Sequence, residues 1–192
     1  NKEVSTPNID RLVSKGFTFT HAYIMGSFSG AVCMPSRAML MTGQYLQKLD
    51  KVQGAIGENI KTMPQLLKES GYTTFFTGKW HNRKASFFKS FTNGENIFMG
   101  GMSNHLKVPL YNFDPSGIYP EKNKFFKDKF SSVLFKEAAV NFLRQYDGIK
   151  PFFACVSFTS PHDPRMAPED YQKKYNTEAI SLPKNFMSKH NF

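Results

Sequence analysis

The spacing of apolar residues along the chain predicts four helices. They are expected over residues 7–15, 35–41, 62–71 and 131–146. In the first and the last of them, apolar side chains recur every three or four residues and so share one helix face. We expect the Thr6 hydroxyl to cap the first helix and Gly16 to end it in a left-handed conformation. Ser131 or Ser132 is expected to cap the last helix.

Three further segments have the pattern of β-strands. Residues 17–23 alternate between apolar and polar positions, and residues 72–77 are rich in β-branched and aromatic side chains. Residues 151–157 form a nearly continuous apolar run, which is typical of a strand buried in a parallel sheet. Residues 82–129 have no clean period, so we expect an ordered excursion that contains short elements.

Helix and strand patterns alternate along the chain, which is typical of the α/β class, with a mostly parallel sheet flanked by helices. No internal repeat or low-complexity segment divides the chain. Three strands are too few for a sheet that could bury the predicted helices, so we expect residues 1–192 to be an incomplete α/β domain. The polar tail from residue 167 onward is expected to hold one or two helical turns at 168–175.

The composition is that of a globular protein with an anionic partner. The 192 residues are 40% hydrophobic and 21% charged, which excludes a disordered tail. Two cysteines are too few for a disulfide-rich framework, and no apolar run approaches the roughly 18 residues of a membrane span. The net charge of +10 favours nucleic acid, acidic lipid or a sulfated or phosphorylated substrate, without choosing among them.

Polar side chains follow two of the expected strands. Lys79 and His81 come directly after the strand expected at 72–77, and His162 comes after the strand expected at 151–157. Ligands of open α/β sheets lie outside the carboxyl ends of the strands. These three side chains are therefore expected to meet at one end of the domain.

Cys33 and Arg37 form a third cluster, at the start of the second expected helix. A helix N-terminus favours an anion through its free N–H groups and its dipole. The separation of four residues places both side chains on one helix face, provided that the helix begins early enough. Lys79 and His81 are two residues apart and share one side of an extended segment, with Trp80 turned away. The cationic groups together suit a tetrahedral oxyanion.

Four segments carry recognisable motifs, in order, over nearly the whole chain. They read Thr-Pro-Asn-Ile-Asp-Arg-Leu at 6–12, Cys-Met-Pro-Ser-Arg-Ala at 33–38, Gly-Tyr-x-Thr-x-x-x-Gly-Lys-Trp-His at 71–81 and Ser-Pro-His-x-Pro at 160–164. A Cys-x-Pro-x-Arg motif alone is a weak signal. The four segments together resemble the type I, formylglycine-dependent sulfatases, an arylsulfatase-like family of the alkaline phosphatase superfamily.

The resemblance implies a catalytic role for each residue of the cluster. Cys33 would be oxidised by the formylglycine-generating enzyme, which recognises the surrounding motif, to formylglycine. One hydroxyl of its hydrated form would attack sulfur, and the second would lose its proton to expel sulfate. Lys79 and His162 would bind sulfate oxygens, with His162 as a proton donor to the leaving oxygen. His81 would contact the formylglycine hydroxyl and assist its deprotonation, and Arg37 would steady the diol.

The resemblance also implies a calcium ion, held between a pair of aspartates near the N-terminus and an Asp-Asn or Asp-Gln pair further on. No Asp-Asp precedes Thr6, and no second pair follows His162. Of the metal ligands, only Cys33, as formylglycine, is expected in this chain. We therefore expect an internal fragment of the N-terminal catalytic sulfatase domain, without its first strand and its C-terminal part, and inactive by itself. Family members are usually periplasmic, secreted or lysosomal.

Three functions remain open from the sequence. The leading hypothesis is hydrolysis of a sulfate ester on a small molecule or, more specifically, a carbohydrate, with neither nucleic acid nor membrane as a partner. The second is a phosphodiesterase or phosphonate monoester hydrolase of the same superfamily, because phosphate and sulfate esters are both tetrahedral oxyanions. The third is a non-catalytic anion-binding homologue in which Cys33 is never converted.

Other residue types in the chain have structural interpretations. Cys155 lies within an apolar strand and is expected in the core, and Asp163 suits a turn as well as it suits a substrate contact. Three histidines are expected to be structural or on the surface: His21, His105 and His190. A stretch of lysines alternates with phenylalanines, and we interpret it as a solvated face with aromatics turned inward rather than as a nucleic-acid patch: Lys122, Lys124, Lys127 and Lys129.

Overall fold

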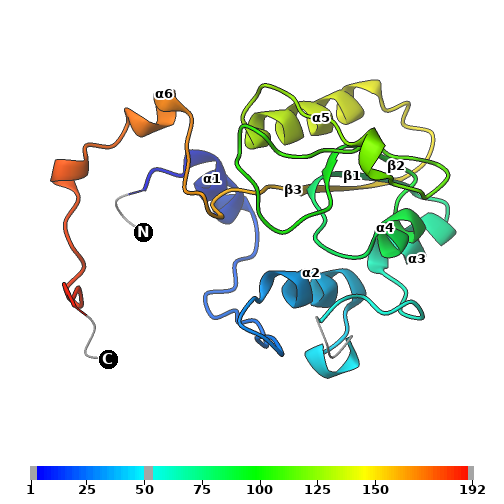
Figure 1. Ribbon diagram of the computed structural model, residues 1–192, viewed down its shortest axis with the longest axis horizontal. Coiled ribbons are helices and arrows are strands. Elements are labelled where there is room, and N and C mark those ends of the chain that lie inside the picture. Colours follow the sequence, from blue (N-terminus) through cyan, green and yellow to red (C-terminus); the bar gives the residue numbers. More distant parts are fainter. Residues whose placement is uncertain (1–3, 50–53, 190–192) are drawn as a thin grey trace. The chain divides into compact units, whose positions relative to one another are not determined.

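A computed structural model describes residues 4–49 and 54–189 of the chain (Figure 1). His190 lies outside the described residues. The chain divides into two compact units, one made of Asn1–Tyr23 and Ala167–Phe192 and the other of Ile24–Met166. Every candidate site residue belongs to the second unit. Within the described parts of the chain, none of the helices combines the length and apolar character needed to cross a membrane.

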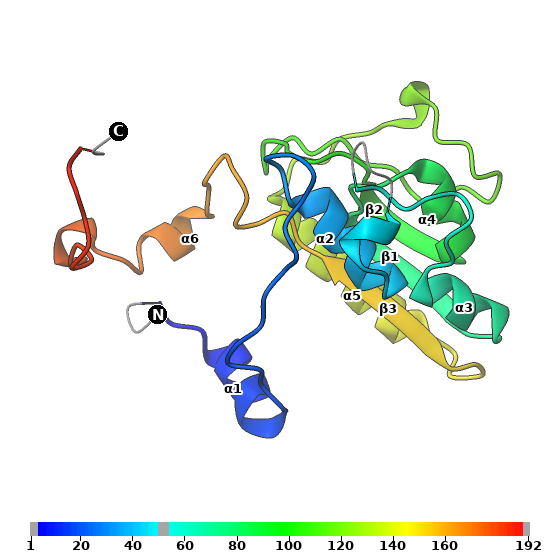
Figure 2. The same cartoon turned by 90° about the horizontal axis from the view of Figure 1, so that it is seen from below.

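The second unit is built on a three-stranded parallel sheet of order β2-β1-β3. The strands are β1 (Thr73–Lys79), β2 (Asn93–Phe98) and β3 (Phe152–Ser157). One face of the sheet carries α5 (Ser131–Gln145), and the other faces the shorter helices (Figures 1 and 2). These are α2 (Cys33–Thr42), α3 (Met63–Glu69) and α4 (Lys84–Ser90). The arrangement confirms the α/β class and its parallel sheet flanked by helices.

Two adjacent phenylalanines of β1, the central strand, pack against the helices on opposite faces of the sheet. Consecutive residues of a strand point to opposite faces of the sheet. Phe75 therefore stacks on Phe142 of α5, with ring centroids 4.3 Å apart. Phe76 points to the other face and meets Phe87 of α4 and Trp80, at 5.4 and 5.6 Å. This strand is buried along nearly its whole length, so its carboxyl end, where Lys79 lies, is held firmly.

The remaining elements are short. In the described parts of the chain, 3-10 helices occur at Leu46–Lys48, Glu121–Asn123 and Thr177–Ala179. The first unit contains α1 (Pro7–Lys15) and α6 (Glu169–Gln172). The helical turn of α6 confirms the expectation for the tail. Within this unit the Ser5 amide donates to the Tyr175 hydroxyl at 3.1 Å.

The prediction of a strand at residues 17–23 was wrong. The third strand of the described sheet is β2, which lies in the excursion at 82–129, where short elements were expected. Alternation alone cannot supply a pairing partner for residues 17–23, and Phe17 and Phe19 are largely exposed. β3 is parallel to β1 as expected, but in the described sheet it is an edge strand and only partly buried, with Phe152 42% exposed.

The helix positions are confirmed, whereas the predicted caps are not. The Thr6 hydroxyl bonds the Asp10 carboxylate at 2.9 Å instead of a backbone N–H, and Gly16 is extended rather than left-handed. No side-chain cap forms at the start of α5. The Ser131 hydroxyl is turned instead toward the ring of His105.

Gly78 allows β1 and β3 to pair closely just before Lys79. Its φ of +99° lies in the region that favours glycine, and an added Cβ would lie 2.0 Å from the Ser157 carbonyl oxygen. Both the conformation and the space therefore require glycine here. The close approach brings the ends of β1 and β3 together, and the candidate site lies at those ends.

We predict that Gly78→Ala lowers the free energy of unfolding by about 3 kcal/mol or more, because it combines backbone strain with a collision against the neighbouring strand. The matched control is Gly71→Ala. Gly71 also has a positive φ, of +90°, but nothing lies within 4 Å of an added Cβ. Gly71→Ala is expected to lower the free energy of unfolding by about 1–2 kcal/mol. Equal losses in urea titrations of the two variants would contradict the role of the close approach.

Candidate active site

Cys33 is the first residue of α2, and its thiol faces a histidine from another element. Its Sγ atom lies 3.2 Å from Nδ1 of His81. The side chain is half-buried at the helix N-terminus, where the helix dipole favours negative charge. The sequence predicted a helix over 35–41 with Cys33 just before or at its N-terminus, and the helix begins at Cys33 itself. A nucleophile at this position would have a hydrogen-bonding partner already in place.

Arg37 joins α2 to the ends of two strands. Its Nη1 donates to the carbonyl oxygen of Lys79 at 2.7 Å and to the hydroxyl of Ser157. Burial lowers the pKa of Arg37, and the nearby thiols of Cys33 and Cys155 act in the opposite direction. Ser157 was not singled out from the sequence, although it is the polar residue that ends β3.

Lys79 is the last residue of β1 and is almost fully buried, with 2% of its surface exposed. Burial lowers the pKa of its ammonium group, and the neighbouring charge of Arg37 lowers it further, while Cys33 raises it. A buried cation beside a second cation is costly unless an anion or strong acceptors lie near it. The position therefore favours an anionic ligand.

His81 ends the strand segment with an unusual backbone conformation. Its φ of +51° is rare for a residue with a side chain, so the extended geometry predicted for Lys79 and His81 does not continue through His81. Burial, followed by the charges of Lys79, Arg37 and His162, lowers the pKa of His81 to about 4. The ring is neutral at neutral pH, and a neutral imidazole nitrogen can accept a proton.

His162 lies on the segment that follows β3. It is near enough to the cluster for its charge to lower the pKa of His81. The side chain is exposed, and its Nδ1 lies 3.0 Å from the carbonyl oxygen of Asp163. A carbonyl can only accept, so Nδ1 carries a hydrogen and Nε2 is the atom left for a ligand.

Two residues that sequence reasoning missed shape the surroundings of these groups. The Asn82 side chain accepts a hydrogen bond from the Ile56 amide at 2.9 Å, which fixes a loop to the end of the His81 segment. Gly101 lies against the His81 ring, since an added Cβ would be 2.6 Å from Nε2. A polar residue directly after a motif and a Gly-Gly pair are weak signals, and neither indicates its partner.

The five predicted residues are thus brought to one end of the sheet. The Cys33 thiol contacts the His81 imidazole and lies near the Arg37 guanidinium and the Lys79 ammonium, and the His162 imidazole lies near His81. These side chains come from α2, from the end of β1 and from the segments that follow β1 and β3. This arrangement can hold a tetrahedral oxyanion against a nucleophile and can place a proton acceptor beside that nucleophile. The second cysteine, Cys155, differs: burial raises the pKa of its thiol to about 11, and it packs against the core.

A calcium ion does not fit the described residues by themselves. Within residues 4–49 and 54–189, no three His, Cys, Asp or Glu side chains are grouped so that they could hold a metal ion. Calcium takes about six to eight oxygen ligands. The groups around Cys33 offer nitrogen atoms rather than oxygen atoms, and the positive charges of Lys79 and Arg37 would repel a cation.

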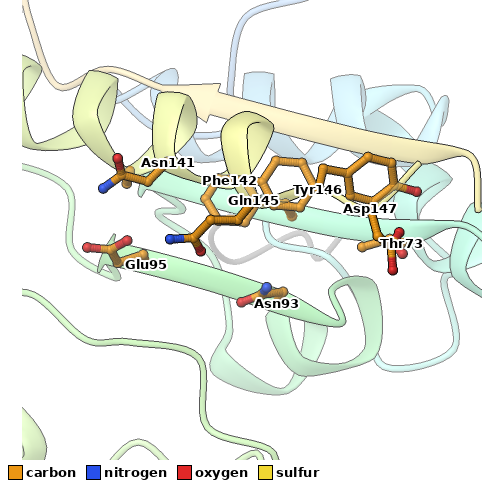
Figure 3. A pocket seen from close by; sticks show the side chains of 10 residues that line it. Thr73, Asn93, Glu95, Asn141, Phe142, Gln145, Tyr146 and Asp147 are labelled. Carbon is orange, nitrogen blue, oxygen red and sulfur yellow. The ribbon is translucent and has the colours of Figure 1, made fainter. Parts of the chain in front are cut away.

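A separate cleft of about 390 Å³ lies at the opposite end of the sheet from the site, between α5 and the starts of β1 and β2 (Figure 3). Thr73 and Asn93, the first residues of these strands, line it together with Asn141 and Gln145. Two carboxylates, Glu95 and Asp147, border it, and none of the residues that line it is Lys or Arg. Its charge does not suit a sulfate or a phosphate group.

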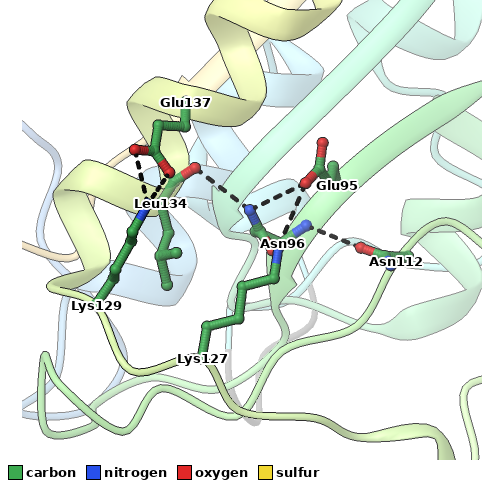
Figure 4. Close-up of polar contacts among 7 residues, drawn as sticks. All are labelled: Glu95, Asn96, Asn112, Lys127, Lys129, Leu134 and Glu137. Carbon is green, nitrogen blue, oxygen red and sulfur yellow. Dashed lines mark hydrogen bonds and ion pairs between the residues drawn. The ribbon is translucent and has the colours of Figure 1, made fainter.

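The lysine-rich stretch is largely paired with carboxylates. Nζ of Lys127 lies 3.5 Å from Oε1 of Glu95, and Nζ of Lys129 lies 3.0 Å from Oε2 of Glu137 (Figure 4). The expectation that its aromatic residues turn inward is confirmed only in part. Phe125 packs against the core, whereas Phe126 is 60% exposed.

The fold and the cluster define an anion-handling site at the carboxyl end of a parallel α/β sheet. Residues 1–189 match the model of the Sulfatase family, so the chain belongs to that family. The resemblance found in the motifs is therefore confirmed.

Relatives and solved structures agree with this assignment. The chain is 26% identical to an arylsulfatase from Klebsiella aerogenes, over 90% of the chain and 41% of the relative. It is 28% identical to an N-acetylglucosamine-6-O-sulfatase from Bacteroides thetaiotaomicron, over 95% of the chain and 31% of the relative. A protein solved with its substrate D-glucosamine-2-N,6-O-disulfate superposes with a TM-score of 0.75 at 22% identity, covering 95% of this chain and 35% of that one.

The chain thus spans less than half the length of these relatives. The structural likeness confirms the alkaline-phosphatase-like fold.

We predict that Gly101→Ala lowers the turnover of any ester cleaved at this site by about 10-fold or more, because the new methyl group displaces the His81 ring from Cys33. The matched control is Gly100→Ala, whose Cβ would meet the Phe98 ring at 2.7 Å instead. Steady-state kinetics should show a loss specific to Gly101→Ala. Equal activities of the two variants would show that contact with His81 is unimportant.

Proposed function

We propose that the protein hydrolyses a sulfate ester, with a formylglycine derived from Cys33 as the nucleophile. The observation that carries this proposal is the half-buried Cys33 at the start of α2, 3.2 Å from a neutral His81 and beside buried Lys79 and Arg37, in a chain of the Sulfatase family. The helix that begins at Cys33 and the segment at 79–81 meet at that side chain, and the segment after β3 lies near His81.

Each residue of the cluster then has a chemical role. Hydrated formylglycine at position 33 supplies an attacking hydroxyl and a second hydroxyl whose deprotonation releases sulfate. His81, neutral and in contact with position 33, accepts a proton there. Lys79 holds sulfate oxygens by charge, and Arg37 keeps position 33 aligned with the end of β1. In its doubly protonated form, His162 would give the Nε2 proton to the leaving oxygen, while its Nδ1–H stays bonded to the Asp163 carbonyl.

A sulfated carbohydrate is the proposed substrate class. Support comes from the N-acetylglucosamine-6-O-sulfatase and from the protein solved with a disulfated glucosamine, both similar to this chain over about 95% of its length. Formylglycine-generating enzyme is the proposed partner for conversion of Cys33. The same proposal includes a calcium ion that has position 33 as one of its ligands. It also includes a periplasmic, secreted or lysosomal location.

The direct test replaces the nucleophile in the full-length protein. Wild-type protein is expected to release sulfate from N-acetylglucosamine 6-sulfate and from 4-nitrophenyl sulfate faster than phosphate from 4-nitrophenyl phosphate. Cys33→Ser can be sulfated but lacks the second hydroxyl, so turnover should fall by about 10³-fold or more, and the serine should be found as its sulfate ester by mass spectrometry.

Two outcomes would contradict the proposal. Faster release of phosphate than of sulfate would identify a phosphoesterase of the same superfamily. Undiminished turnover by Cys33→Ser would show that residue 33 is not the nucleophile. The control is Cys155→Ser, which changes a core thiol outside the proposed chemistry and is expected to keep its turnover.

A further inference from the structure

His105 is a buried histidine that lies outside the cluster around Cys33. Only 1% of its surface is exposed, and its ring stacks on Phe130 with centroids 5.2 Å apart. Nδ1 lies 3.0 Å from the Ser131 hydroxyl and 3.1 Å from the Thr159 hydroxyl. Nε2 lies 3.0 Å from the main-chain carbonyl oxygen of His162. The ring thus connects the excursion, the start of α5 and the segment after β3.

The partners of His105 assign its hydrogens. A carbonyl oxygen can only accept, so Nε2–H donates to His162. In the neutral ring Nδ1 then accepts from one of the two hydroxyls, and these lie 2.8 Å from each other. Ser131 and Thr159 are 0% and 6% exposed. Buried polar groups stabilise a structure when they are satisfied in this way and destabilise it when one partner is removed.

The segment held by this network is the one that carries His162. The His162 amide donates to the Thr159 carbonyl at 3.1 Å, and the Ser132 hydroxyl donates to the Ser160 hydroxyl at 3.3 Å. The His162 side chain itself is exposed, and the hydrogen bond found for its ring is a short-range one to the Asp163 carbonyl. The position of its ring therefore depends on the main chain beneath it, and His105 binds that main chain.

We propose that His105 is a positioning residue for His162: its Nε2–H holds the His162 carbonyl and so places the His162 ring at the leaving oxygen of the substrate. This inference rests on the proposed function, in which His162 donates the proton to that oxygen. His105 lies in the part of the excursion between β2 and α5, so this part of the chain would also contribute to catalysis.

The test uses two substrates that differ in their need for a proton donor. A sugar sulfate has a poor leaving group that needs an acid, whereas 4-nitrophenyl sulfate releases a stable phenolate. In the full-length protein, His105→Phe keeps the shape and the stacking on Phe130 but removes both hydrogen bonds. We expect kcat for the sugar sulfate to fall by about 10–100-fold, a part of what general acid catalysis supplies. KM and the rate for 4-nitrophenyl sulfate should change by less than about 3-fold.

Two further variants separate positioning from stability. His105→Gln keeps an N–H donor for the His162 carbonyl and is expected to recover most of the lost rate. Phe142→Leu weakens the packing of α5 against Phe75 of β1, a cluster that does not include His105, and should affect both substrates alike. A fall by the same factor for both substrates in His105→Phe, or no fall, would overturn the proposal.

A second measurement does not depend on activity. Arg165, which lies three residues after His162, is exposed, so trypsin can cleave after it once the segment loosens. His105→Phe should be cleaved there at least several-fold faster than wild type, and Phe142→Leu should not. Unchanged cleavage would overturn the positioning role. If the wild-type protein hydrolyses no sulfate ester, the proposed function fails, and this measurement still decides whether His105 holds the segment.

Discussion

The hydrogen bonds of Arg37 are the contacts on which the site depends. One side chain of α2 reaches the carbonyl of Lys79 at the end of β1 and the hydroxyl of Ser157 at the end of β3. These hydrogen bonds fix the helix that carries Cys33 to the sheet, together with helix packing and the contact between the Cys33 thiol and His81. The close pairing of β1 and β3 at Gly78 makes this possible, because it brings both acceptors within reach of one guanidinium.

Burial of these groups explains the electrostatics of the site. Burial makes charged groups costly, and here it lowers the pKa values of Arg37, Lys79 and His81 together. Proteins keep such groups close when a ligand of opposite charge offsets the cost. A sulfate ester carries that charge. Of these three groups, only His81 has a pKa far enough below 7, at about 4, to be neutral at neutral pH, as its proposed role as a base beside residue 33 requires.

Much of this could be predicted from the sequence, because the strongest signals are local. A proline-started helix, two runs of β-formers and residues at fixed spacing indicated α2, β1 and β3 and the side chains at their ends. The strand at 93–98 was missed because its pairing with β1, not its own pattern, makes it a strand. Ser157 and Gly101 were missed, and His105 was expected only as a structural or surface residue, because each makes its contact with a residue at least 20 positions away.

Whether residue 33 is converted to formylglycine can be measured as the mass of its tryptic peptide, residues 16–37, from protein made in its native host. We expect a mass in which the cysteine thiol is replaced by the aldehyde of formylglycine, or by its hydrate. An unmodified thiol in protein from that source would contradict this expectation. The cationic cluster would then bind an anion without cleaving it.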